Sequence, residues 1–194
     1  MSADYFHGDP RTNYQRMVAG DDYISDDPLI TQAQAQATSR TAAFNQAYQD
    51  DPEASQTLAA ELFGEFGEEA HVRGPVRVDY GTHISIGPRT FINWGLTAVD
   101  VAPVRIGADC QIGPGVQLLT ATHPVSPTPR RDKVEGSAPV TLEDNVWLGG
   151  GAIICPGVTI GKNSVIGAGA VVTRDIPANV VAVGNPARVV RENI

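Results

Sequence analysis

From Leu142 onward, apolar side chains recur at every sixth position of the chain. The run LEDNVW, LGGGAI, ICPGVT, IGKNSV, IGAGAV, VTRDIP opens each block with an aliphatic residue and places a small or β-branched residue four positions later. An α-helix has a period near 3.6 and a strand a period of 2, so neither explains this spacing. The same period starts earlier at Tyr80 and, after a skip of two residues around VDVAPVR, resumes at Ile106.

A short fixed repeat indicates a solenoid, and hexapeptides are typical of parallel β-helices. Each block would form one short strand and one turn, with the aliphatic side chain inside and Gly, Asn or Asp in the turn, where left-handed backbone angles are tolerated. Three blocks close a triangular coil, which predicts about five coils stacked ~4.8 Å apart. The alternative is a sandwich with glycine-rich turns, but sandwich strands recur irregularly, about every 8–12 residues.

The first third of the chain has a helical pattern instead. An Asp-Pro pair at residues 27–28 is typical of an N-cap followed by proline at the first helical position. The segment LITQAQAQATSRTAAFNQAYQ then carries apolar residues at helical spacing. A second Asp-Pro pair at 51–52 predicts another helix start ahead of ASQTLAAELF, with Gly64 as its expected end. Residues 11–66 are therefore predicted to be helical.

We expect two differently built parts. Residues 1–66 would form an N-terminal arm and helical segment, and residues 67–194 a β-helix with a C-terminal tail. The repeat is interrupted at residues 120–139, which we call the arm. A β-helix has no use for such an excursion, so the arm should project away from the coils. The proline-rich SPTPRR is also compatible with a disordered loop.

Composition narrows the classes of function. A chain of 194 residues fits one domain with an appendage, and a net charge of −8 argues against a nucleic-acid-binding protein. Cys110 and Cys155 give neither a zinc spacing nor a disulfide framework, and Cys110 falls at a small, buried position of its repeat. The polar start MSADYFHGDPR is unlike a signal peptide, and no apolar run is long enough to span a bilayer. We expect a cytoplasmic protein without nucleic-acid or membrane partners.

Several longer motifs occur in a fixed order: RMVAGDDY, ELFGEFGEE, VDYGTHISIG, FINWGLTAVDVAPVRIG, IGPGVQLLTATHP, NVWLGGGAIICPGVTIG and VIGAGAVVTRDIPANVVAVGNPARVVR. Over about residues 14–192 the chain thus resembles the maltose/galactoside O-acetyltransferases and the related nodulation-factor acetyltransferases. The resemblance implies a mainly β fold, a left-handed parallel β-helix, although crossover connections are otherwise right-handed. It also implies acetyl-CoA as co-substrate, no bound cofactor or metal, a sugar hydroxyl as acceptor, and a homotrimer with active sites between subunits.

His123, in TATHP, stands where the repeat opens into the arm. Taken alone, it is better explained as a histidine that caps the edge of a coil. The resemblance implies that it is the catalytic base, and that the arm reaches a neighbouring subunit and helps to wall the active site. No cysteine or serine accompanies His123 in a recognisable triad, so we expect direct transfer without an acyl-enzyme.

The resemblance also implies residues that bind the acceptor. The aspartate that follows AG-x-x-Y in the family falls on Ser25 by ungapped match, with Asp26 next to it, and we assign Asp26. Asp100 would orient His123 or line the pocket, or it is a turn aspartate. Glu135 matches an acidic position in the arm, although the flanking GSA departs from the family pattern. The predicted acceptor residues are Asp26, Asp79, Asn93, Asp100 and Glu135.

For the donor, the resemblance implies contacts with coenzyme A along the later coils. Trp147 faces outward by the sixfold phase and would line the thioester tunnel, where small residues let pantetheine lie against the backbone. The backbone N–H of Gly150, within a run of three glycines, would stabilise the oxyanion. Guanidinium groups near the last coil suit the nucleotide phosphates, although a solvated surface is the ordinary place for an arginine. The predicted donor residues are Trp147, Gly150, Ala168, Thr173, Arg174, Arg188 and Arg191.

Other readings remain open at this point. A hexapeptide acyltransferase that acts on an antibiotic or an amine is the main enzymatic alternative. A γ-type carbonic anhydrase would share the β-helix but needs three histidines on zinc, and only His71, His83 and His123 lie near or within the coils. A non-catalytic β-helix that serves as a scaffold is the third class, and the intact TATHP and NVW stretches argue against it.

Overall fold

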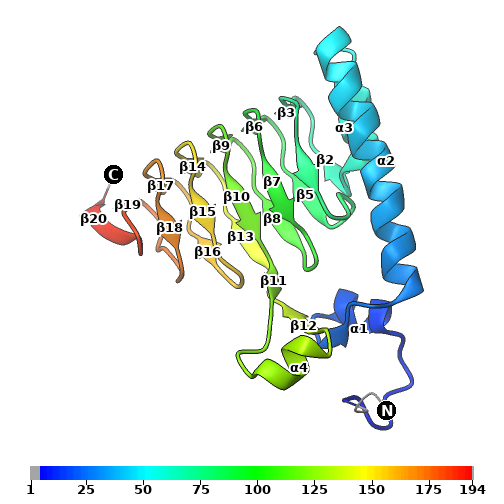
Figure 1. Cartoon of the computed structure of the whole chain (residues 1–194). Helices are drawn as coiled ribbons and strands as arrows, with labels where there is room; N and C mark the ends of the chain where they lie inside the picture. The colour runs from blue at the N-terminus through cyan, green and yellow to red at the C-terminus, as the bar shows by residue number, and fades with distance from the viewer. Residues whose placement is uncertain (1–4, 194) are drawn as a thin grey trace.

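The computed structural model describes residues 5–193. Figure 1 shows a solenoid of stacked coils, with helices lying across the end formed by the first coil and the arm hanging from the middle. The fold is mainly β, as predicted. The helices are α1 (Asn13–Ala19), α2 (Pro28–Asp50), α3 (Gln56–Leu62) and, in the arm, α4 (Pro127–Arg131).

The solenoid has three faces, each a sheet whose solenoid strands are parallel. Face I contains β4 (Arg77–Val78), β7 (Thr97–Val99), β10 (Gln117–Leu119), β15 (Ile153–Ile154) and β18 (Val171–Val172). Face II contains β2 (Glu65–Phe66), β5 (Ile84–Ile86), β8 (Val104–Ile106), β13 (Val140–Leu142) and β16 (Thr159–Ile160). Face III contains β3 (His71–Val72), β6 (Phe91–Ile92), β9 (Gln111–Ile112), β14 (Trp147–Leu148), β17 (Val165–Ile166), β19 (Val180–Val183) and the antiparallel β20 (Arg188–Glu192).

The chain turns from face to face at three corners. The first corner joins face I to face II, the second joins face II to face III, and the third joins face III back to face I. Faces I and II each have five strands and face III has six parallel ones, so the solenoid has about six turns where about five coils were predicted. Corners matter here because His123, Asp79, Asn93 and Gly150 all lie at one of them.

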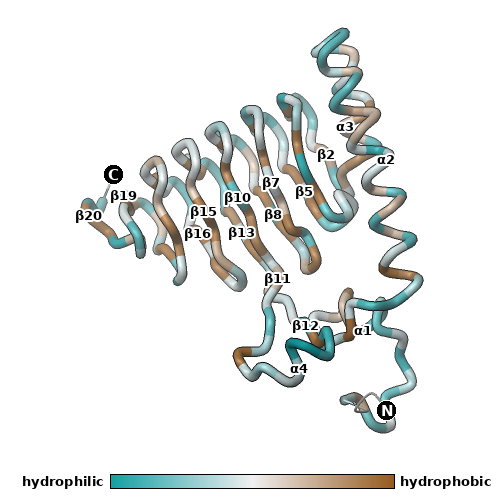
Figure 2. The backbone as a smooth tube through the Cα atoms, viewed as in Figure 1, coloured by the Kyte–Doolittle hydropathy of each residue, from teal (hydrophilic) through white to brown (hydrophobic). Residues whose placement is uncertain are grey.

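The sixfold period is the burial pattern of the coils. The residues that open the blocks are at most 1% exposed, and so are four of the six residues at the fifth position. Both sets form one continuous core: Leu142, Leu148, Ile154, Ile160, Ile166 and Val172 with Val146, Ala152, Val158, Ser164, Ala170 and Ile176. In Figure 2, apolar brown and polar teal positions alternate along the coils, whereas α4 is mostly hydrophilic. Cys110 is fully buried, as its place in the repeat predicts.

Asparagine forms the turns of the second corner in the later coils. Asn145, Asn163 and Asn179 all have φ near +60°, a region where asparagine is favoured among side-chain-bearing residues. Their side-chain amides also bond to one another, Asn145 Nδ2 to Asn163 Oδ1 at 3.0 Å and Asn163 Nδ2 to Asn179 Oδ1 at 2.8 Å. The turn residues thus stack in the same register as the core.

The N-terminal helices close the first end of the solenoid. Asp27 caps α2 as predicted, accepting a hydrogen bond from the Leu29 N–H at 2.8 Å. The amide of Asn45 on α2 bonds both the N–H and the C=O of Val76, at 2.8 and 2.9 Å. Gln56 does the same for Val72, at 2.9 and 3.1 Å. These side chains satisfy backbone groups that would otherwise form an open sheet edge.

The prediction that residues 11–66 are helical is wrong at β1 (Tyr23–Ile24) and at β2, which already belongs to face II, and one predicted helix start is also wrong. The Asp-Pro pair at 51–52 does not begin α3, whose first residue is Gln56. The carboxylate of Asp51 instead accepts hydrogen bonds from the N–H groups of Glu53 and Ala54, at 3.1 and 3.0 Å. Aspartate closes a local turn by such bonds as readily as it caps a helix, so the sequence signal is ambiguous.

The arm leaves at the first corner and returns without disturbing the coils. Strand β13 after the arm pairs with β8 in register, Val140 opposite Val104 and Leu142 opposite Ile106. The arm itself is ordered: β11 (Ala121–Thr122) and β12 (Val134–Ser137) flank α4. Strand β12 also pairs antiparallel with β1 (Tyr23–Ile24), so the arm projects from the prism and packs on the N-terminal segment of its own chain.

Candidate active site

His123 follows β11 at the first corner and lines a cavity of about 390 Å³. The imidazole is exposed, and it makes no hydrogen bond within residues 5–193. The walls come from the N-terminal segment, α2, the first corner and the arm. The lining residues are Tyr23, Ser25, Ile30, Gln34, Asp79, Tyr80, Val99, Val101, Ala121, His123 and Glu135. Polar and acidic groups therefore surround an exposed imidazole that has no hydrogen-bond partner in the described part of the chain.

Glu135 is held in this cavity by the N-terminal segment. Tyr23 stands opposite Glu135 in the β1–β12 pair, and its hydroxyl donates to Glu135 Oε2 at 2.6 Å. Burial, together with this bond to a carboxylate, raises the pKa of Tyr23 above its usual range. Tyr23 therefore stays protonated and fixes the orientation of Glu135.

Asp79 is the second carboxylate of the cavity. Burial, with the charges of Asp100 and Glu135 adding to it, raises the pKa of Asp79 to about 6. The carboxylate of Asp100 is fully buried behind it and accepts hydrogen bonds from the N–H groups of Asp79, Tyr80 and Gly81, at 2.8, 3.0 and 2.7 Å. Asp100 does not line the cavity, and its contacts are those of a turn aspartate that positions Asp79.

The N-terminal loop places Ser25 and Asp26 differently. Ser25 lines the cavity, and its N–H donates to the Lys133 carbonyl at 3.0 Å. Asp26 is exposed, and its carboxylate accepts from Lys133 Nζ at 2.8 Å on the outside of the arm. Of the two candidates for the family's aspartate position, the ungapped match Ser25 is therefore the one among the lining residues.

A second hollow lies at the third corner. It has a volume of about 490 Å³ and includes Asn93, Trp147, Gly150 and Ala168, so Asn93 lies with the predicted donor residues and not beside His123. Trp147 faces outward and is 55% exposed, as the repeat phase predicts. The N–H of Gly150 donates to no group in the described part of the chain. We call this hollow the groove.

A row of outward side chains leads from the groove to the last strand. On face III, Trp147 pairs with Val165, Val165 with Val181, and Val181 with Arg191. Three strand spacings separate Trp147 from Arg191, about 14 Å. Arg188 lies on the same strand, β20, and both arginines are exposed. Trp147 and Arg191 therefore mark the two ends of one extended track.

Thr173 and Arg174 are not on this track. They follow β18 at the first corner, on the same edge of the prism as His123, and both are exposed. The cavity and the groove share no lining residue and lie at different corners. The structure therefore divides the predicted site residues into two sets within one chain.

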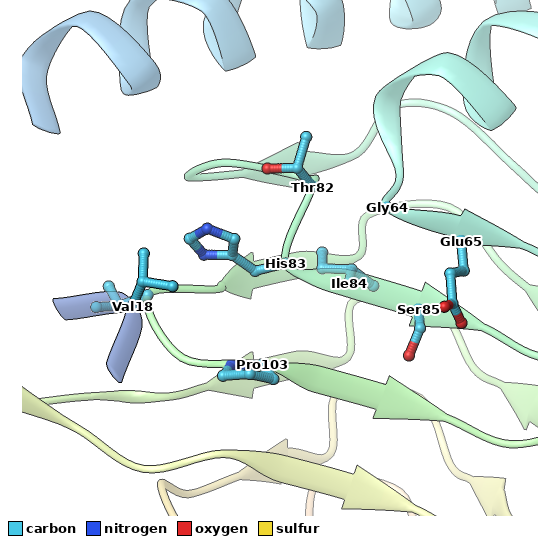
Figure 3. Close-up of a pocket in the computed structure, with 9 residues that line it drawn as sticks. Val18, Gly64, Glu65, Thr82, His83, Ile84, Ser85 and Pro103 are labelled. Atoms are coloured by element: carbon cyan, nitrogen blue, oxygen red, sulfur yellow. The ribbon is translucent and has the colours of Figure 1, made fainter. Parts of the chain in front are cut away.

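His83 belongs to a third, smaller hollow of about 310 Å³, shown in Figure 3 with Val18, Glu65 and Ser85. Its Nδ1 lies 2.7 Å from the Asp100 carbonyl oxygen, and its ring stacks on Tyr80 with centroids 4.7 Å apart. Among residues 5–193, no three His, Cys, Asp or Glu side chains gather as a metal site would require. His83 thus braces the corner that carries Asp79.

Known proteins share both parts of this architecture. Residues 139–174 match the model of the bacterial transferase hexapeptide (six repeats), and residues 16–67 match the maltose acetyltransferase hexapeptide capping motif. The chain is 40% identical over 181 residues to a galactoside O-acetyltransferase of Lactococcus lactis, covering 93% of this chain and 87% of that protein. The chain belongs to the maltose and galactoside O-acetyltransferase family.

Solved structures agree along nearly the whole chain. A maltose O-acetyltransferase from Clostridium difficile 630 superposes with a TM-score of 0.91 at 40% identity, covering 95% of this chain and 98% of that one. A galactoside acetyltransferase in complex with coenzyme A superposes with a TM-score of 0.90 at 39% identity, covering 95% and 92%. The family resemblance carried by the sequence motifs is thereby confirmed.

The sequence indicated only part of the N-terminal contribution to the cavity, namely the stretch at Ser25 and Asp26. Tyr23, Ile30 and Gln34 line it, and none was a candidate. Tyr23 ends the motif RMVAGDDY, which was a usable signal. Gln34 sits in a helix with an ordinary amphipathic pattern, so nothing local distinguishes it from its neighbours.

Proposed function

We propose that this chain transfers an acetyl group from acetyl-CoA to a hydroxyl group of a sugar, with His123 as the general base. Its family membership supports acetyl transfer, and a relative bound to coenzyme A supports the donor. The observation that carries the proposal is the exposed His123 in a cavity lined by polar and acidic groups. Such a lining suits an acceptor with many hydroxyl groups, because each needs a hydrogen-bond partner when it leaves water.

The reaction follows from the chemistry of the two partners. A sugar hydroxyl has a pKa far above neutrality, so a base must remove its proton as the oxygen attacks the thioester carbon. Histidine is the side chain best suited to that transfer near neutral pH. The new C–O bond forms, the C–S bond breaks, and the imidazolium returns the proton to the departing thiolate. Cys110 is fully buried, which leaves it no part in an acyl-enzyme.

The donor would lie along the groove and the track beside it. The N–H of Gly150, which has no partner among residues 5–193, is a fixed donor for the oxyanion that forms during attack. The span of about 14 Å from Trp147 to Arg191 suits an extended pantetheine arm, with phosphates near the arginines. Because His123 lies at another corner, one chain does not complete the site, and we propose that a second copy in a homotrimer supplies the other half.

The test is acetyl transfer itself. Purified protein with acetyl-CoA and a panel of sugars, amino sugars and aminoglycosides is followed by the released thiol. We expect turnover with a neutral sugar and a fall in kcat of roughly 10²–10⁴ for His123→Ala. His71→Ala is the matched control, because His71 lies outside the cavity and its ring stacks on Phe91, with ring centroids 6.1 Å apart.

Two results would count against this assignment. Near-wild-type turnover by a correctly folded His123→Ala protein would show that His123 is not the general base. A trapped acetyl-enzyme would show that the acetyl group is not transferred directly. Preference for an amine acceptor over every hydroxyl would instead favour the alternative, an acyltransferase that acts on an antibiotic or an amine.

A further inference from the structure

The amide oxygen of Asn93 is already occupied within its own chain. Asn93 follows β6 at the third corner, in the groove. Its Oδ1 accepts the backbone N–H of Trp94 at 2.9 Å and the Nη1 of Arg73 at 3.3 Å. A carbonyl oxygen has two lone pairs, so Oδ1 has no capacity left for a substrate. What remains is the NH₂ group, which can only donate.

Arg73 is itself fixed on three sides. Its Nε donates to the Tyr48 hydroxyl on α2 at 3.2 Å, and its guanidinium carbon lies 4.2 Å from the centre of the Trp94 ring. Its backbone N–H donates to the Ile92 carbonyl at 2.9 Å, which ties it to the coil that carries Asn93. A guanidinium held by an aromatic face, a hydroxyl and an amide loses little further freedom when substrate arrives.

This arrangement decides which way the amide faces. The oxygen and nitrogen of an asparagine side chain occupy nearly the same shape, so only hydrogen-bond partners distinguish the two orientations. Arg73 has donors only, and so does the Trp94 N–H. A flipped Asn93 would set its NH₂ group against both, leaving three donors facing one another. The Arg73 guanidinium and the Trp94 N–H together therefore hold the Asn93 Oδ1 inward and its NH₂ group outward.

We propose that Arg73 is a positioning residue that holds the Asn93 amide so that its NH₂ group donates to an oxygen atom of the acetyl acceptor. The proposal rests on the proposed acetyl transfer. The carboxylates around His123 accept hydrogen bonds, whereas the Asn93 NH₂ group donates one. The proposal therefore requires the acceptor to present, at the third corner, an oxygen that accepts a hydrogen bond. Arg73 touches no reacting atom itself, so its effect on the reaction passes entirely through Asn93.

The test is a double-mutant cycle with Arg73→Met, Asn93→Ala and the two combined. We expect Arg73→Met to lower kcat/KM for the acceptor roughly tenfold, the size of one charge-assisted hydrogen bond, with the KM for acetyl-CoA nearly unchanged. In the Asn93→Ala background the same change should add little further loss. Arg105→Met, an exposed arginine on face II, is the matched control and should leave both constants near wild type.

A second measurement does not depend on turnover. In protein labelled with ¹⁵N-asparagine, the Asn93 side-chain amide signal is identified by its loss in Asn93→Ala. It should shift in Arg73→Met and stay in place in Arg105→Met. Arg73→Lys should keep part of the activity, because it keeps a donor near Oδ1 but loses the planar fork.

Some outcomes would overturn the proposal. These are independent, multiplicative losses in the double variant, an unmoved Asn93 amide signal, or a loss of activity that follows a loss of melting temperature. A wild-type protein that transfers acetyl to no hydroxyl acceptor would defeat the proposed function instead. In that case the amide signal alone would still test whether Arg73 orients Asn93.

Discussion

At the scale of single residues, the cavity around His123 holds more negative charge than its lining compensates. Asp79 and Glu135 both line it, with the buried Asp100 behind, and no lysine or arginine is among the described lining residues. The cost falls on Asp79, because burial and the neighbouring carboxylates raise its pKa to about 6. A group kept for binding at the expense of the fold is a common property of functional sites.

The sign of this cost can be tested. In the unfolded chain an aspartate has a pKa of about 3.9. The raised pKa of Asp79 in the folded chain means that its ionisation opposes folding, increasingly as pH rises from about 4 through about 6. Asp79→Asn removes the charge. We therefore expect it to melt at a higher temperature than wild type at pH 8, with the difference disappearing as pH falls to about 4.

Thermal melts across this pH range measure the effect. Glu61→Gln is the control, since Glu61 is exposed on α3 and lies outside the cavity. The same Asp79→Asn protein should bind the acceptor more weakly. A melting temperature at pH 8 equal to or below that of wild type would show that Asp79 is not destabilised by its surroundings.

At the scale of elements, the turn between β14 and β15 contains Gly149 and Gly150, which are needed for different reasons. A Cβ on Gly149 would lie 2.5 Å from the backbone nitrogen of Ala168 in the next coil, so the close stacking of the coils requires glycine. A Cβ on Gly150 would lie 3.3 Å from the Pro114 carbonyl oxygen, a tight contact that a small shift relieves. Sequence alone gives the run of glycines but not this division.

Gly150→Val should therefore damage catalysis more than folding. The side chain would stand over the groove and keep the thioester carbonyl from the Gly150 N–H, an interaction worth about 3 kcal/mol in comparable sites. We expect a large fall in kcat or a rise in the KM for acetyl-CoA, with the melting temperature largely kept. Gly149→Ala should do the reverse and lower the melting temperature, and matching effects from the two variants would contradict this division. A complex with the Gly150 amide far from the thioester carbonyl would also exclude the oxyanion role.

What the sequence could predict depended on how far apart along the chain the interacting residues lie. The coils were predictable because burial in a β-helix repeats every six residues, so Leu142 through Val172 needed only a local pattern. The Tyr23–Glu135 bond was not, because it joins residues 112 positions apart through a strand pair that no short motif encodes. The place of Asn93 also escaped, because its corner is known only after the coils are counted.

At the scale of the whole molecule, the predicted site residues fall into two sets that a single prism keeps apart. His123, Asp79 and Glu135 line the cavity beside the first corner, whereas Trp147 and Gly150 line the groove at the third. The arm was expected to need a neighbouring subunit because it has no partner in its own prism. It does pair with β1 of its own chain, so the argument for assembly now rests on the divided site.

A shared site makes a prediction about mixtures of inactive proteins. His123→Ala keeps an intact groove, and Gly150→Val keeps an intact base. If each active site takes its base from one subunit and its groove from the next, a mixed trimer rebuilds some sites from the two intact halves. Random assembly of equal amounts would restore about one quarter of the sites, because both neighbours must be of the right kind in the right order.

The two variants are therefore co-expressed with different affinity tags, and mixed oligomers are purified through both tags. The quarter applies to all trimers together, whereas every trimer that carries both tags has one of its three sites rebuilt. Activity of the purified mixed oligomers near a third of wild type, against traces in each parent, would show that the site spans two subunits, and sedimentation should give the mass of three chains. Mixed oligomers no more active than their parents would place both halves in one chain. A fully active monomer would have the same meaning, and the separation of His123 from Gly150 would then need a movement of the arm to close it.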